Sequence, residues 1–236
     1  MSIVHNRLHL FIDFDGTIST EDTVDLLLAR FAGPRWEVVE AAWQRGEIGS
    51  LDCLAQQVAL LSMTPEDLRA SIGDIPVDPY AADFIAQCHR AGFSVTVLSD
   101  GLDVVARGVL GGMGIDVPVI SNRLEWCGGG RWRLGFPHAW HGCASAAGNC
   151  KCRTVAASAA GAVLIGDGRS DYCAAALAAE MVFAKGKLLA HCRAQGIRHV
   201  AFADFGDLLA GGPAWSLLDA MADEGRGAPS YRQAMH

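Results

Sequence analysis

The sequence has no stretch dominated by basic residues, and its charge balance is acidic. Among its 236 residues, 19 Lys and Arg stand against 26 Asp and Glu, which gives a formal net charge of −7. A nucleic-acid surface needs a cluster or stripe of Lys and Arg, so we expect no nucleic-acid partner. An anionic substrate would have to be attracted by local cations or by a metal ion, because the overall field repels it.

Long apolar runs and an export signal are also lacking. The longest apolar tract, Val155–Ile165, is shorter than the ~20 residues of a membrane-spanning helix, so we expect no membrane partner. The N-terminal segment lacks the basic start, apolar core and small-residue cleavage site of a signal peptide. We therefore expect a cytoplasmic protein whose eight cysteines are free thiols.

Paired C-x2-C spacings, which are typical of structural zinc sites, do not occur among the cysteines. The cysteines near residue 150 follow the spacing C-x6-C-x-C, with two histidines shortly before them. We interpret this cluster as thiols that line a pocket or pack in the core. Zinc binding is the alternative, and its ligands would come from His138, His141, Cys143, Cys150 and Cys152.

Hydrophobic residues are abundant (51%), so the chain can bury a sizeable core. Short apolar runs alternate with helical patterns, and one helix is expected over 79–92, with Pro79 in its first turn. This alternation predicts an α/β fold with a doubly wound, mainly parallel sheet. The predicted strands are 8–13, 93–99, 117–121, 162–166, 181–184 and 198–202.

Two insertions interrupt this alternation. Between Gly16 and Asp78 the sequence shows only helical patterns, with capping-box spacings from Ser19 to Asp22 and from Thr64 to Asp67. We expect a helical cap over 18–78 and a hairpin flap over about 121–136, which turns at Gly128–Gly130. The core would then consist of residues 1–17 and 79–236.

Carboxylates stand where the first predicted strand ends. Asp13 and Asp15 lie two residues apart, so both can face one point beyond the strand. Ligands of open parallel sheets bind at the carboxyl ends of the strands, so we expect reactive or ligand-binding residues at the other strand ends as well. The candidates there are Ser99, Asp100, Gly101, Asp167 and Asp171, with Lys151 before the strand 162–166.

Four carboxylates cannot share a small site without a cation, because like charges at short range disfavour joint ionisation. Mg²⁺ prefers oxygen ligands and is often held by a few carboxylates together with a substrate phosphate. The sequence therefore predicts a Mg²⁺ site at which a small phosphorylated molecule reacts.

The motif "DFDGT", a strand-end Ser99, Lys151 and "GDGRSD" occur in the order of the four motifs of the haloacid dehalogenase superfamily, which the chain resembles over essentially its whole length. A helical cap after the first motif and a hairpin after the second resemble the phosphoserine-phosphatase-like branch, subfamily IB. The resemblance implies a Rossmann-like core and a Mg²⁺-dependent phosphatase.

By this resemblance, Asp13 attacks phosphorus and forms an aspartyl-phosphate, while Asp15 protonates the leaving alcohol and then activates water. Ser99 and Lys151 would hold the phosphoryl oxygens. The Mg²⁺ ion would be bound by Asp13, the Asp15 main chain and Asp167, and Asp171 would support the metal or orient Lys151.

The substrate-binding positions depart from phosphoserine phosphatases. Those enzymes use a glutamate where this chain has Asp22, a cap arginine where it has Gln57, and usually an asparagine where it has Ser170. A neutral amide cannot replace a bidentate arginine on a carboxylate, which disfavours phosphoserine. The predicted substrate-binding residues are Asp22, Gln57, Ser99, Asp100, Gly101 and Lys151.

The chain most resembles the methionine-salvage branch, the 2-hydroxy-3-keto-5-methylthiopentenyl-1-phosphate phosphatases. The resemblance rests on Asp22 and on "FAGPRWE", "SNRLEW", "LGFPH", the Gly-Asn-Cys-Lys run and "FAKGKL". Phosphoserine phosphatase and another small-metabolite phosphatase are the alternatives.

Two further alternatives remain: a phospho-accepting regulatory module, which is a different class, and a mutase that passes the phosphoryl group to another alcohol. The tryptophans gather in the predicted cap and flap, where they pack or form an apolar wall for the substrate: Trp36, Trp43, Trp126, Trp132 and Trp140. The sequence is compatible with a monomer or a homodimer.

Overall fold

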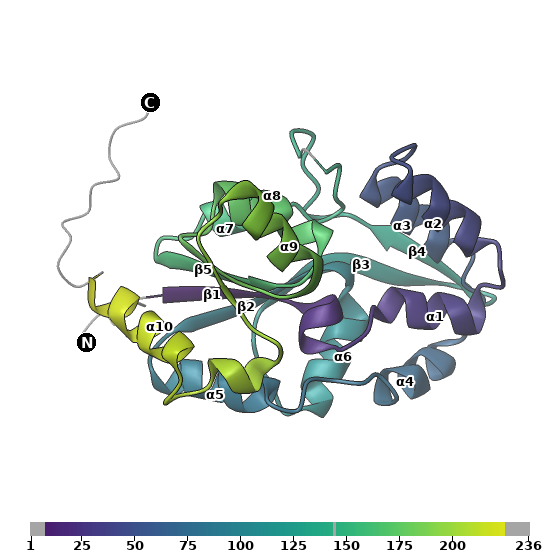
Figure 1. The fold of residues 1–236 in the computed structure, drawn as a ribbon. Helices are drawn as coiled ribbons and strands as arrows, with labels where there is room; N and C mark the ends of the chain where they lie inside the picture. Colours follow the sequence, from purple (N-terminus) through teal and green to yellow (C-terminus); the bar gives the residue numbers. More distant parts are fainter. Residues whose placement is uncertain (1–7, 144, 225–236) are drawn as a thin grey trace.

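A sheet of seven strands runs through the middle of the molecule (Figure 1). The computed structural model describes residues 8–143 and 145–224. The strand order is β4-β3-β2-β1-β5-β6-β7, with every neighbouring pair parallel except β3–β4. The strands are β1 (Leu8–Asp13), β2 (Ser94–Leu102), β3 (Val119–Gly128), β4 (Arg131–Gly135), β5 (Gly161–Gly166), β6 (Met181–Ala184) and β7 (His199–Ala201). The predicted α/β sheet is therefore confirmed.

The central strand β1 shows why its sequence is apolar on both sides. Leu10 and Ile12 face one buried cluster, whereas Phe11 faces a second cluster on the other side of the sheet. Successive side chains of a strand point to opposite faces, so a strand covered on both faces must be apolar throughout. Because β1 is central, Asp13 at its end lies in the middle of one sheet edge.

Helices cover both faces of the sheet and one of its ends. In Figure 1, α7 to α9 lie above the sheet, α5, α6 and α10 lie below it, and α1 to α4 lie at the right-hand end. The helices are α1 (Thr23–Phe31), α2 (Trp36–Gln44), α3 (Ser50–Val58), α4 (Pro65–Gly73), α5 (Ala81–Arg90), α6 (Asp103–Gly112), α7 (Lys151–Ala156), α8 (Tyr172–Leu177), α9 (Gly186–Gln195) and α10 (Pro213–Glu224).

The helices α1 to α4 fall within the range that we expect to form a cap. The two connections to this range pair with each other, since the Thr20 N–H donates to the Pro76 carbonyl and the Asp78 N–H donates to the Ile18 carbonyl. The division into a cap (18–78) and a core (1–17 and 79–236) stays a proposal, and residues 1–7 and 225–236 of that core lie outside the described residues.

Two details of the helix starts differ from expectation. The prediction of a capping box from Ser19 to Asp22 is wrong. Asp22 is itself the N-cap of α1, and its side chain accepts hydrogen bonds from the Val24 and Asp25 N–H groups. Ser19 instead donates its hydroxyl to the Phe14 carbonyl, because the turn after β1 brings that carbonyl close. Pro79 precedes α5 rather than lying in its first turn, since Tyr80 is the N-cap.

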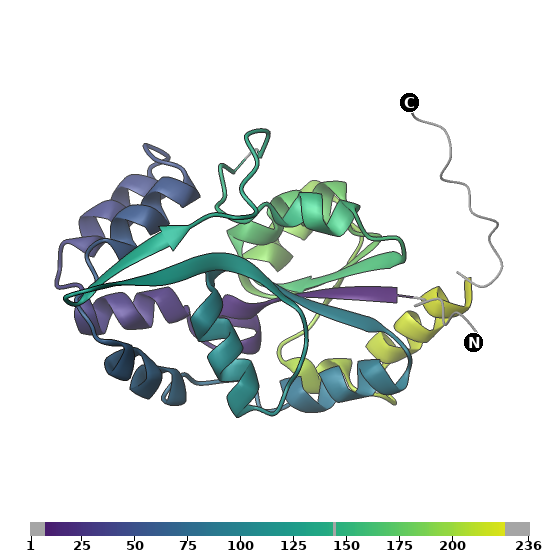
Figure 2. The same cartoon turned by 180° about the vertical axis from the view of Figure 1, so that it is seen from behind.

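The flap hairpin is a continuation of the sheet. The predicted strand 117–121 is the start of β3, which runs on from the sheet to Gly128 and turns back into β4 (Figure 2). Trp126 packs on Trp132 across this hairpin, with ring centroids 4.9 Å apart. The Trp132 indole N–H donates to the Met63 carbonyl, which ties the hairpin to the segment between α3 and α4.

Among the described residues, no helix combines the length and the apolar character that crossing a membrane requires.

Candidate active site

The polar residues at the strand ends come together at one edge of the sheet. Asp13 ends β1, Asp15 lies in the turn Phe14–Ile18 that follows, and Ser99 lies in the last part of β2. Asp167 follows β5, and Lys151 is the first residue of α7. Parallel neighbours β1, β2 and β5 end at the same edge, so their polar residues meet there even though they are distant in sequence.

Lys151 is the buried cation of the site. Its Nζ atom lies 2.6 Å from Asp13 Oδ1 and 2.8 Å from Asp171 Oδ1, and it donates to Ser170 Oγ at 2.9 Å. All three charged side chains are almost completely buried. Two nearby carboxylates outweigh the burial that would lower the pKa of Lys151, and the pKa is raised. A buried charge of this kind persists only when it is paired, which fixes the position of Nζ.

Three carboxylates form a compact acidic group. Asp13, Asp167 and Asp171 each offer an oxygen, and these atoms all lie within 4.8 Å of one another. Burial first, and the Asp171 charge next, raise the pKa of Asp13 well above its usual range; burial likewise raises the pKa of Asp167. One lysine cannot balance three carboxylates, and an all-oxygen donor set suits a hard divalent cation.

Asp15 is held by two hydroxyl groups and a backbone N–H group. Thr23 donates its backbone N–H (3.0 Å) and its hydroxyl (2.6 Å) to Asp15 Oδ1, and the Ser99 hydroxyl donates to Oδ2 (3.0 Å). Ser99 Oγ in turn accepts from the Gly101 N–H at 2.9 Å. Asp13 and Asp15 therefore have different surroundings although they are two residues apart: one is paired with a cation, and the other accepts from neutral donors.

Gly16 permits the close approach between the turn after β1 and the end of β5. Its backbone has φ of 75°, and a Cβ atom there would lie 2.5 Å from Asp167 Oδ2. A side chain would therefore be strained and would displace a member of the acidic group. Thr17, the next residue, donates its hydroxyl to Asp167 Oδ1 at 2.8 Å and is fully buried.

Asp100 points into a network of two buried asparagines. Its Oδ1 accepts from the Asn149 N–H at 2.9 Å, and the Asn122 amide donates to the Asp100 carbonyl at 2.6 Å. Asn149 also donates its side-chain amide to the Ser99 and Ile120 carbonyls, both at 2.9 Å. The network joins the end of β2 to the residues that lead into Lys151.

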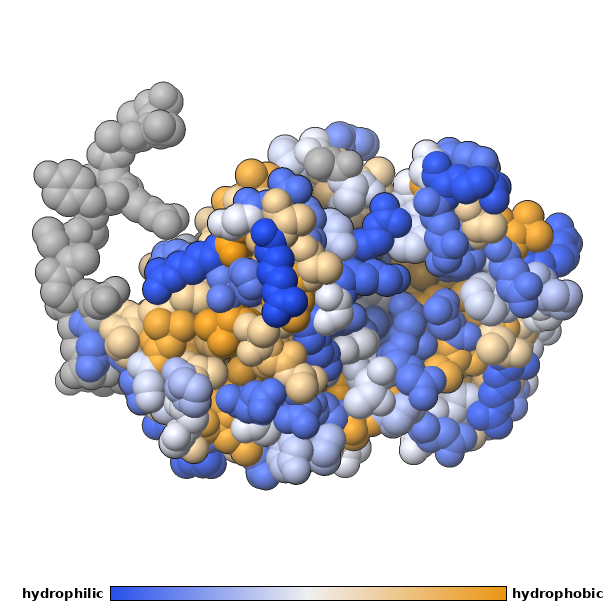
Figure 3. Space-filling model, viewed as in Figure 1, coloured by the Kyte–Doolittle hydropathy of each residue, from blue (hydrophilic) through white to orange (hydrophobic). Residues whose placement is uncertain are grey.

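A cleft of about 1010 Å³ opens over this edge of the sheet. In Figure 3 hydrophilic side chains gather around the hollow between the α1–α3 side and the α7–α9 side. Its wall includes Asp13, Asp15, Asp100, Gly101 and Asp167, so the acidic group faces open space that a small molecule could fill.

Asp22 and Gln57 also line the cleft, from the α1–α3 side. Asp22 keeps exposed surface toward the cleft, and its pKa is raised, first because the surrounding walls desolvate it and then because Asp15 and Asp25 lie near. Gln57 is buried and donates to Glu40 Oε2 at 3.1 Å. Both predicted residues thus line the cleft, and their role in substrate binding stays a prediction.

Trp43 is the one member of the tryptophan group among the residues that line the cleft. The Arg169 guanidinium lies over its ring, 5.0 Å from the centroid, so this contact joins α2 to the loop after β5. Trp126 and Trp140 are exposed, and Trp132 bonds to the Met63 carbonyl. Trp36 and Trp132 pack against the larger buried cluster, so packing is the better description for these two.

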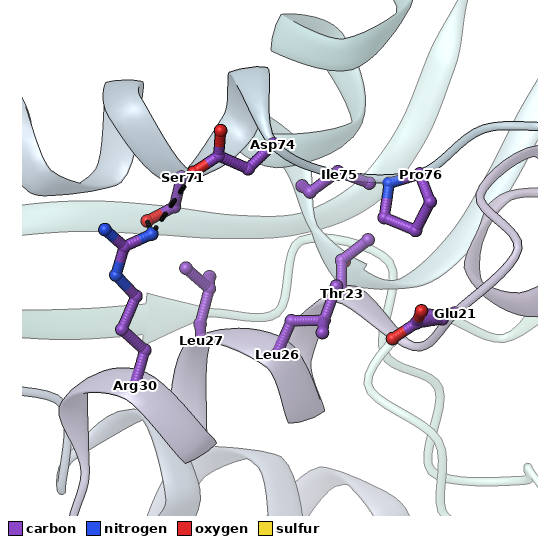
Figure 4. Close-up of a pocket in the computed structure, with 9 residues that line it drawn as sticks. All are labelled: Glu21, Thr23, Leu26, Leu27, Arg30, Ser71, Asp74, Ile75 and Pro76. Carbon is purple, nitrogen blue, oxygen red and sulfur yellow. Dashed lines mark hydrogen bonds and ion pairs between the residues drawn. The ribbon is translucent and has the colours of Figure 1, made fainter.

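A second, smaller pocket of about 320 Å³ lies between α1 and the α4 end of the cap range (Figure 4). Arg30 crosses its rim and donates to Ser71 Oγ at 3.3 Å and to Asp74 Oδ2 at 3.4 Å. None of the strand-end carboxylates lines it. Of these two pockets, the larger cleft is therefore the one that contains the candidate site residues.

The alternative of a zinc site is not supported by the geometry. Among the described residues, the acidic group is the only set of three or more His, Cys, Asp or Glu side chains whose ligand atoms all lie within 4.8 Å of one another. All eight cysteines are free thiols, as the sequence predicts.

Sequence reasoning missed four residues that position the site. Thr17, Thr23, Asn122 and Asn149 each contact a strand-end residue. Thr17 and Asn149 lie inside motifs that the sequence shows, "DFDGT" and the Gly-Asn-Cys-Lys run, so a polar residue next to a motif was an available signal. Asn122 lies in the same way inside "SNRLEW", whereas Thr23 has no such signal, because only the turn after β1 brings it to the site.

A comparison with protein-family models matches residues 10–176 to the haloacid dehalogenase-like hydrolases. The chain belongs to this family. The match covers most of the chain and contains every strand-end residue of the site, from Asp13 to Asp171.

Curated relatives align with this chain over most of their own length. The chain is 29% identical to a 2-hydroxy-3-keto-5-methylthiopentenyl-1-phosphate phosphatase of Exiguobacterium over 208 residues, 86% of this chain and 95% of the relative. It is 29% identical to a protein of the same name from Geobacillus kaustophilus, with 86% and 94% covered. A phosphoserine phosphatase of Halobacterium salinarum is 28% identical over 67% of this chain and 77% of the relative.

Solved structures show the same fold. A phospho-aspartyl intermediate analogue of phosphoserine phosphatase superposes with a TM-score of 0.64 at 22% identity, covering 86% of this chain and 97% of the other. A haloacid dehalogenase-family hydrolase from Salmonella enterica gives 0.67 at 20% identity, with 86% and 69% covered. The predictions of the family, of the Rossmann-like fold class and of a phosphatase are therefore confirmed.

Proposed function

We propose that the protein is a Mg²⁺-dependent phosphomonoesterase that uses Asp13 as its nucleophile. The observation that carries the proposal is the arrangement at the sheet edge: a buried lysine and three carboxylates converge beside a second aspartate, Asp15, that is held by neutral donors. Two carboxylates with different surroundings suit two different roles around one phosphorus.

The residues present fit a Mg²⁺ ion. Asp13, Asp167 and Asp171 supply closely spaced oxygens, and the raised pKa values of Asp13 and Asp167 reflect negative charge that a cation would balance. In our proposal these three side chains and the Asp15 main chain hold the ion. Bound there, Mg²⁺ would neutralise charge on the transferring phosphoryl group.

In the proposed reaction, the protein's own side chains and backbone N–H groups perform the attack, the proton transfers and the positioning of the phosphoryl group. Lys151 Nζ and the Phe14 N–H both contact Asp13 Oδ1, so Oδ2 is the oxygen that we propose attacks phosphorus. The bond from phosphorus to the ester oxygen breaks, and Asp15 gives that oxygen a proton. Asp15 then takes a proton from the water that attacks the aspartyl-phosphate, and Ser99, the Gly101 N–H and Lys151 position the phosphoryl oxygens.

For the substrate, we propose a small phosphate ester of the 2-hydroxy-3-keto-5-methylthiopentenyl-1-phosphate type. Relatives with this name cover the chain almost end to end, at 25–29% identity. The part of the cleft beside Gln57 and Trp43 also contains Ile48 and Leu54, which offer apolar surface to an uncharged substrate end.

Phosphoserine is the second candidate, because solved phosphoserine phosphatases share the fold and a curated relative of that name is 28% identical over 67% of the chain. Against it, Gln57 is buried and already donates to Glu40, so this position offers no positive charge for a substrate carboxylate. A cytoplasmic location and a monomeric or homodimeric state stay predictions.

The test is a panel of phosphate esters, assayed with Mg²⁺ and with a chelator. We expect p-nitrophenyl phosphate to be hydrolysed only with Mg²⁺, and the 2-hydroxy-3-keto-5-methylthiopentenyl ester to have a kcat/KM at least about 10-fold above that of phosphoserine, the size of one or two lost contacts. A phosphoserine preference would overturn the substrate assignment. A long-lived phosphorylated protein without phosphate release would overturn the phosphatase and favour a regulatory module, whereas an isomeric product would reveal a mutase.

A further inference from the structure

A row of thiols lies beside the buried lysine. Cys150 and Cys152 flank Lys151 in sequence, and their Sγ atoms are 3.4 Å apart. The Cys143 thiol interacts in turn with the Cys150 thiol. Cys150 and Cys152 are buried, whereas Cys143 is half-buried. At the other end of the row, Cys152 interacts with Cys173, which is also half-buried, so a reagent from solvent can reach the row at Cys143 or at Cys173.

The row does not have the shape of a metal site. A tetrahedral zinc site places its sulfurs about 2.3 Å from the ion and so about 3.8 Å from one another. Among the described residues, no three of these sulfurs lie within even 4.8 Å of one another. A chain of pairwise contacts suits reactions between thiols instead.

The surroundings of Cys143 favour a thiolate. Its Sγ atom lies 3.3 Å from Ser145 Oγ, and the backbone N–H groups of Ser145 and Ala147 donate to the same sulfur. Ala146, between those two donors, has the left-handed φ of 46°, which turns successive N–H groups toward one side. Burial alone would raise the pKa of Cys143, but these hydrogen bonds outweigh it and the pKa is lowered.

We propose that Cys143 and Cys150 form an oxidative modification site that reacts with hydroperoxides. The Cys143 thiolate attacks the hydroperoxide, the O–O bond breaks, hydroxide or alkoxide leaves, and a sulfenic acid forms. The sulfur of Cys150 then attacks the sulfenic sulfur, the S–O bond breaks, and water leaves with the Cys150 proton. The hydroperoxide is reduced by two electrons, and a Cys143–Cys150 disulfide results.

The disulfide would act on the site through the backbone. Cys150 is the N-cap residue of α7, and Lys151 follows it directly. Drawing Cys150 toward Cys143 moves the start of α7, whereas Nζ must keep contacts of 2.6 and 2.8 Å to two carboxylates. A shift of about 1 Å at such a position can cost about 10²-fold in rate. This consequence, unlike the oxidation itself, rests on the proposed function.

Peptide mapping of the full chain tests the chemistry independently of any activity. After hydrogen peroxide treatment, alkylation and trypsin digestion, the peptide Leu134–Lys151 should lose two hydrogens, because it carries both cysteines. Burial raises the pKa of Cys150 to about 12, so we expect the second step to be slow and a dimedone adduct of Cys143 to be trapped early. A peptide linked to Cys152–Arg153, or an unchanged Leu134–Lys151, would overturn the proposal.

Activity assays with matched variants test the consequence. We expect peroxide to lower p-nitrophenyl phosphatase activity of the natural chain at least about 10-fold and dithiothreitol to restore it. Cys143→Ser should keep its activity under peroxide, and Cys127→Ser, which removes an exposed cysteine of the hairpin, should stay as sensitive as the natural chain. Equal sensitivity of Cys143→Ser would overturn the assignment. If no phosphatase activity is found at all, the proposed function fails while the mapping still decides the oxidation.

Discussion

The two walls of the cleft are built differently. On the sheet side, Lys151, Asp13 and Asp171 are almost completely buried, and Lys151 Nζ lies within 2.8 Å of both carboxylates. On the helical side, Asp22 keeps exposed surface, and Gln57, although buried, carries no charge and donates one hydrogen bond of 3.1 Å to Glu40. Burial makes charge interactions strong and geometry rigid, whereas exposed groups are screened by water.

In the proposed function, the sheet side of the cleft carries out the reaction and the helical side selects the substrate. A reacting phosphoryl group needs charges fixed in place before it arrives, which the sheet side provides. A substrate's other end can be recognised by weaker contacts that change more readily without loss of the fold. Changes on the sheet side should therefore alter the reaction rate and stability, and changes on the helical side should alter substrate preference.

The largest effect should come from Asp13→Asn. The substitution keeps the shape but removes the attacking oxygen, so we expect kcat to fall by at least about 10⁴-fold. The measurement is turnover of p-nitrophenyl phosphate with Mg²⁺ present. Asp116→Asn, at an exposed position outside the cleft, is the control and should keep full activity. Near-normal turnover of Asp13→Asn would remove the nucleophile from the proposal.

Lys151→Met should affect both the rate and the stability. It leaves Asp13 and Asp171 buried without their cation, and breaking a buried pair in this way costs about 3–5 kcal/mol of unfolding free energy. We expect kcat to fall by about 10³-fold, as when a preorganised charge is lost. Urea unfolding measures the stability, and Arg193→Met, at an exposed position of the helix α9 outside the cleft, is the control. An unchanged urea midpoint would show that the pair is not the rigid element that we describe.

The metal-free protein should become less stable as the pH rises. Burial first, and the Asp171 charge next, raise the folded-state pKa of Asp13, and burial raises that of Asp167. A carboxyl with a raised pKa stabilises the fold fully below its unfolded pKa of about 4, and this contribution is lost as the pH rises through the folded value.

Mg²⁺ should therefore raise the Tm more at about pH 8 than at about pH 5, because the carboxylates must be deprotonated to bind it. At a hundredfold excess over Kd we expect about 5–10 °C at the higher pH. Differential scanning fluorimetry with and without Mg²⁺ measures both shifts. Asp167→Asn should reduce the Mg²⁺ shift, and an equal shift at both pH values would contradict the predicted linkage.

On the helical side, Gln57→Ala should change substrate binding more than the chemical step. The substitution frees Glu40 from the amide that holds it, so we expect KM to rise by about 3–10-fold with kcat within about 2-fold. Gln56→Ala, the exposed neighbour on the same helix, should change neither. A loss confined to kcat would place Gln57 on the chemical side of the comparison.

The smallest effect should come from the contact between the two walls. The Arg169 guanidinium lies 5.0 Å from the Trp43 ring centroid, and such cation–π contacts are worth about 0.5–1 kcal/mol at exposed sites. We expect Arg169→Ala and Trp43→Ala to raise KM by about 2–5-fold each, and the double variant to add little. Full additivity in this double-mutant cycle would show that the two side chains act separately.

Much of the fold could be predicted because its signals are local. Apolar runs of strand length, the Thr64–Asp67 capping box and the glycines of the hairpin each act within a few residues, and the structure has all of them. The errors were also local. Ser19 and Pro79 were assigned to helix starts by spacing, but the turn after β1 and the Tyr80 N-cap give them other positions.

The residues of the site were predictable for a second reason. Asp13, Lys151 and Asp167 occur in the order of a known set of motifs. Asp13 and Asp167 also lie at the ends of parallel strands, whose carboxyl ends meet at one edge of the sheet. Their partners were less accessible to sequence reasoning. Thr23 reaches Asp15 only through the geometry of the intervening turn, and Asn149 joins β2 to β3 from a loop without regular structure.

By itself, the sequence determined the alternation of strands and helices, the helical character of 18–78 and the set of polar residues at strand ends, because hydrophobic periodicity and capping act over short distances. Only the tertiary structure decided which carboxylate pairs with Lys151, which one is held by Thr23 and Ser99, and which thiols meet. Those choices depend on distances between segments far apart in the chain, where burial and mutual charge select one arrangement.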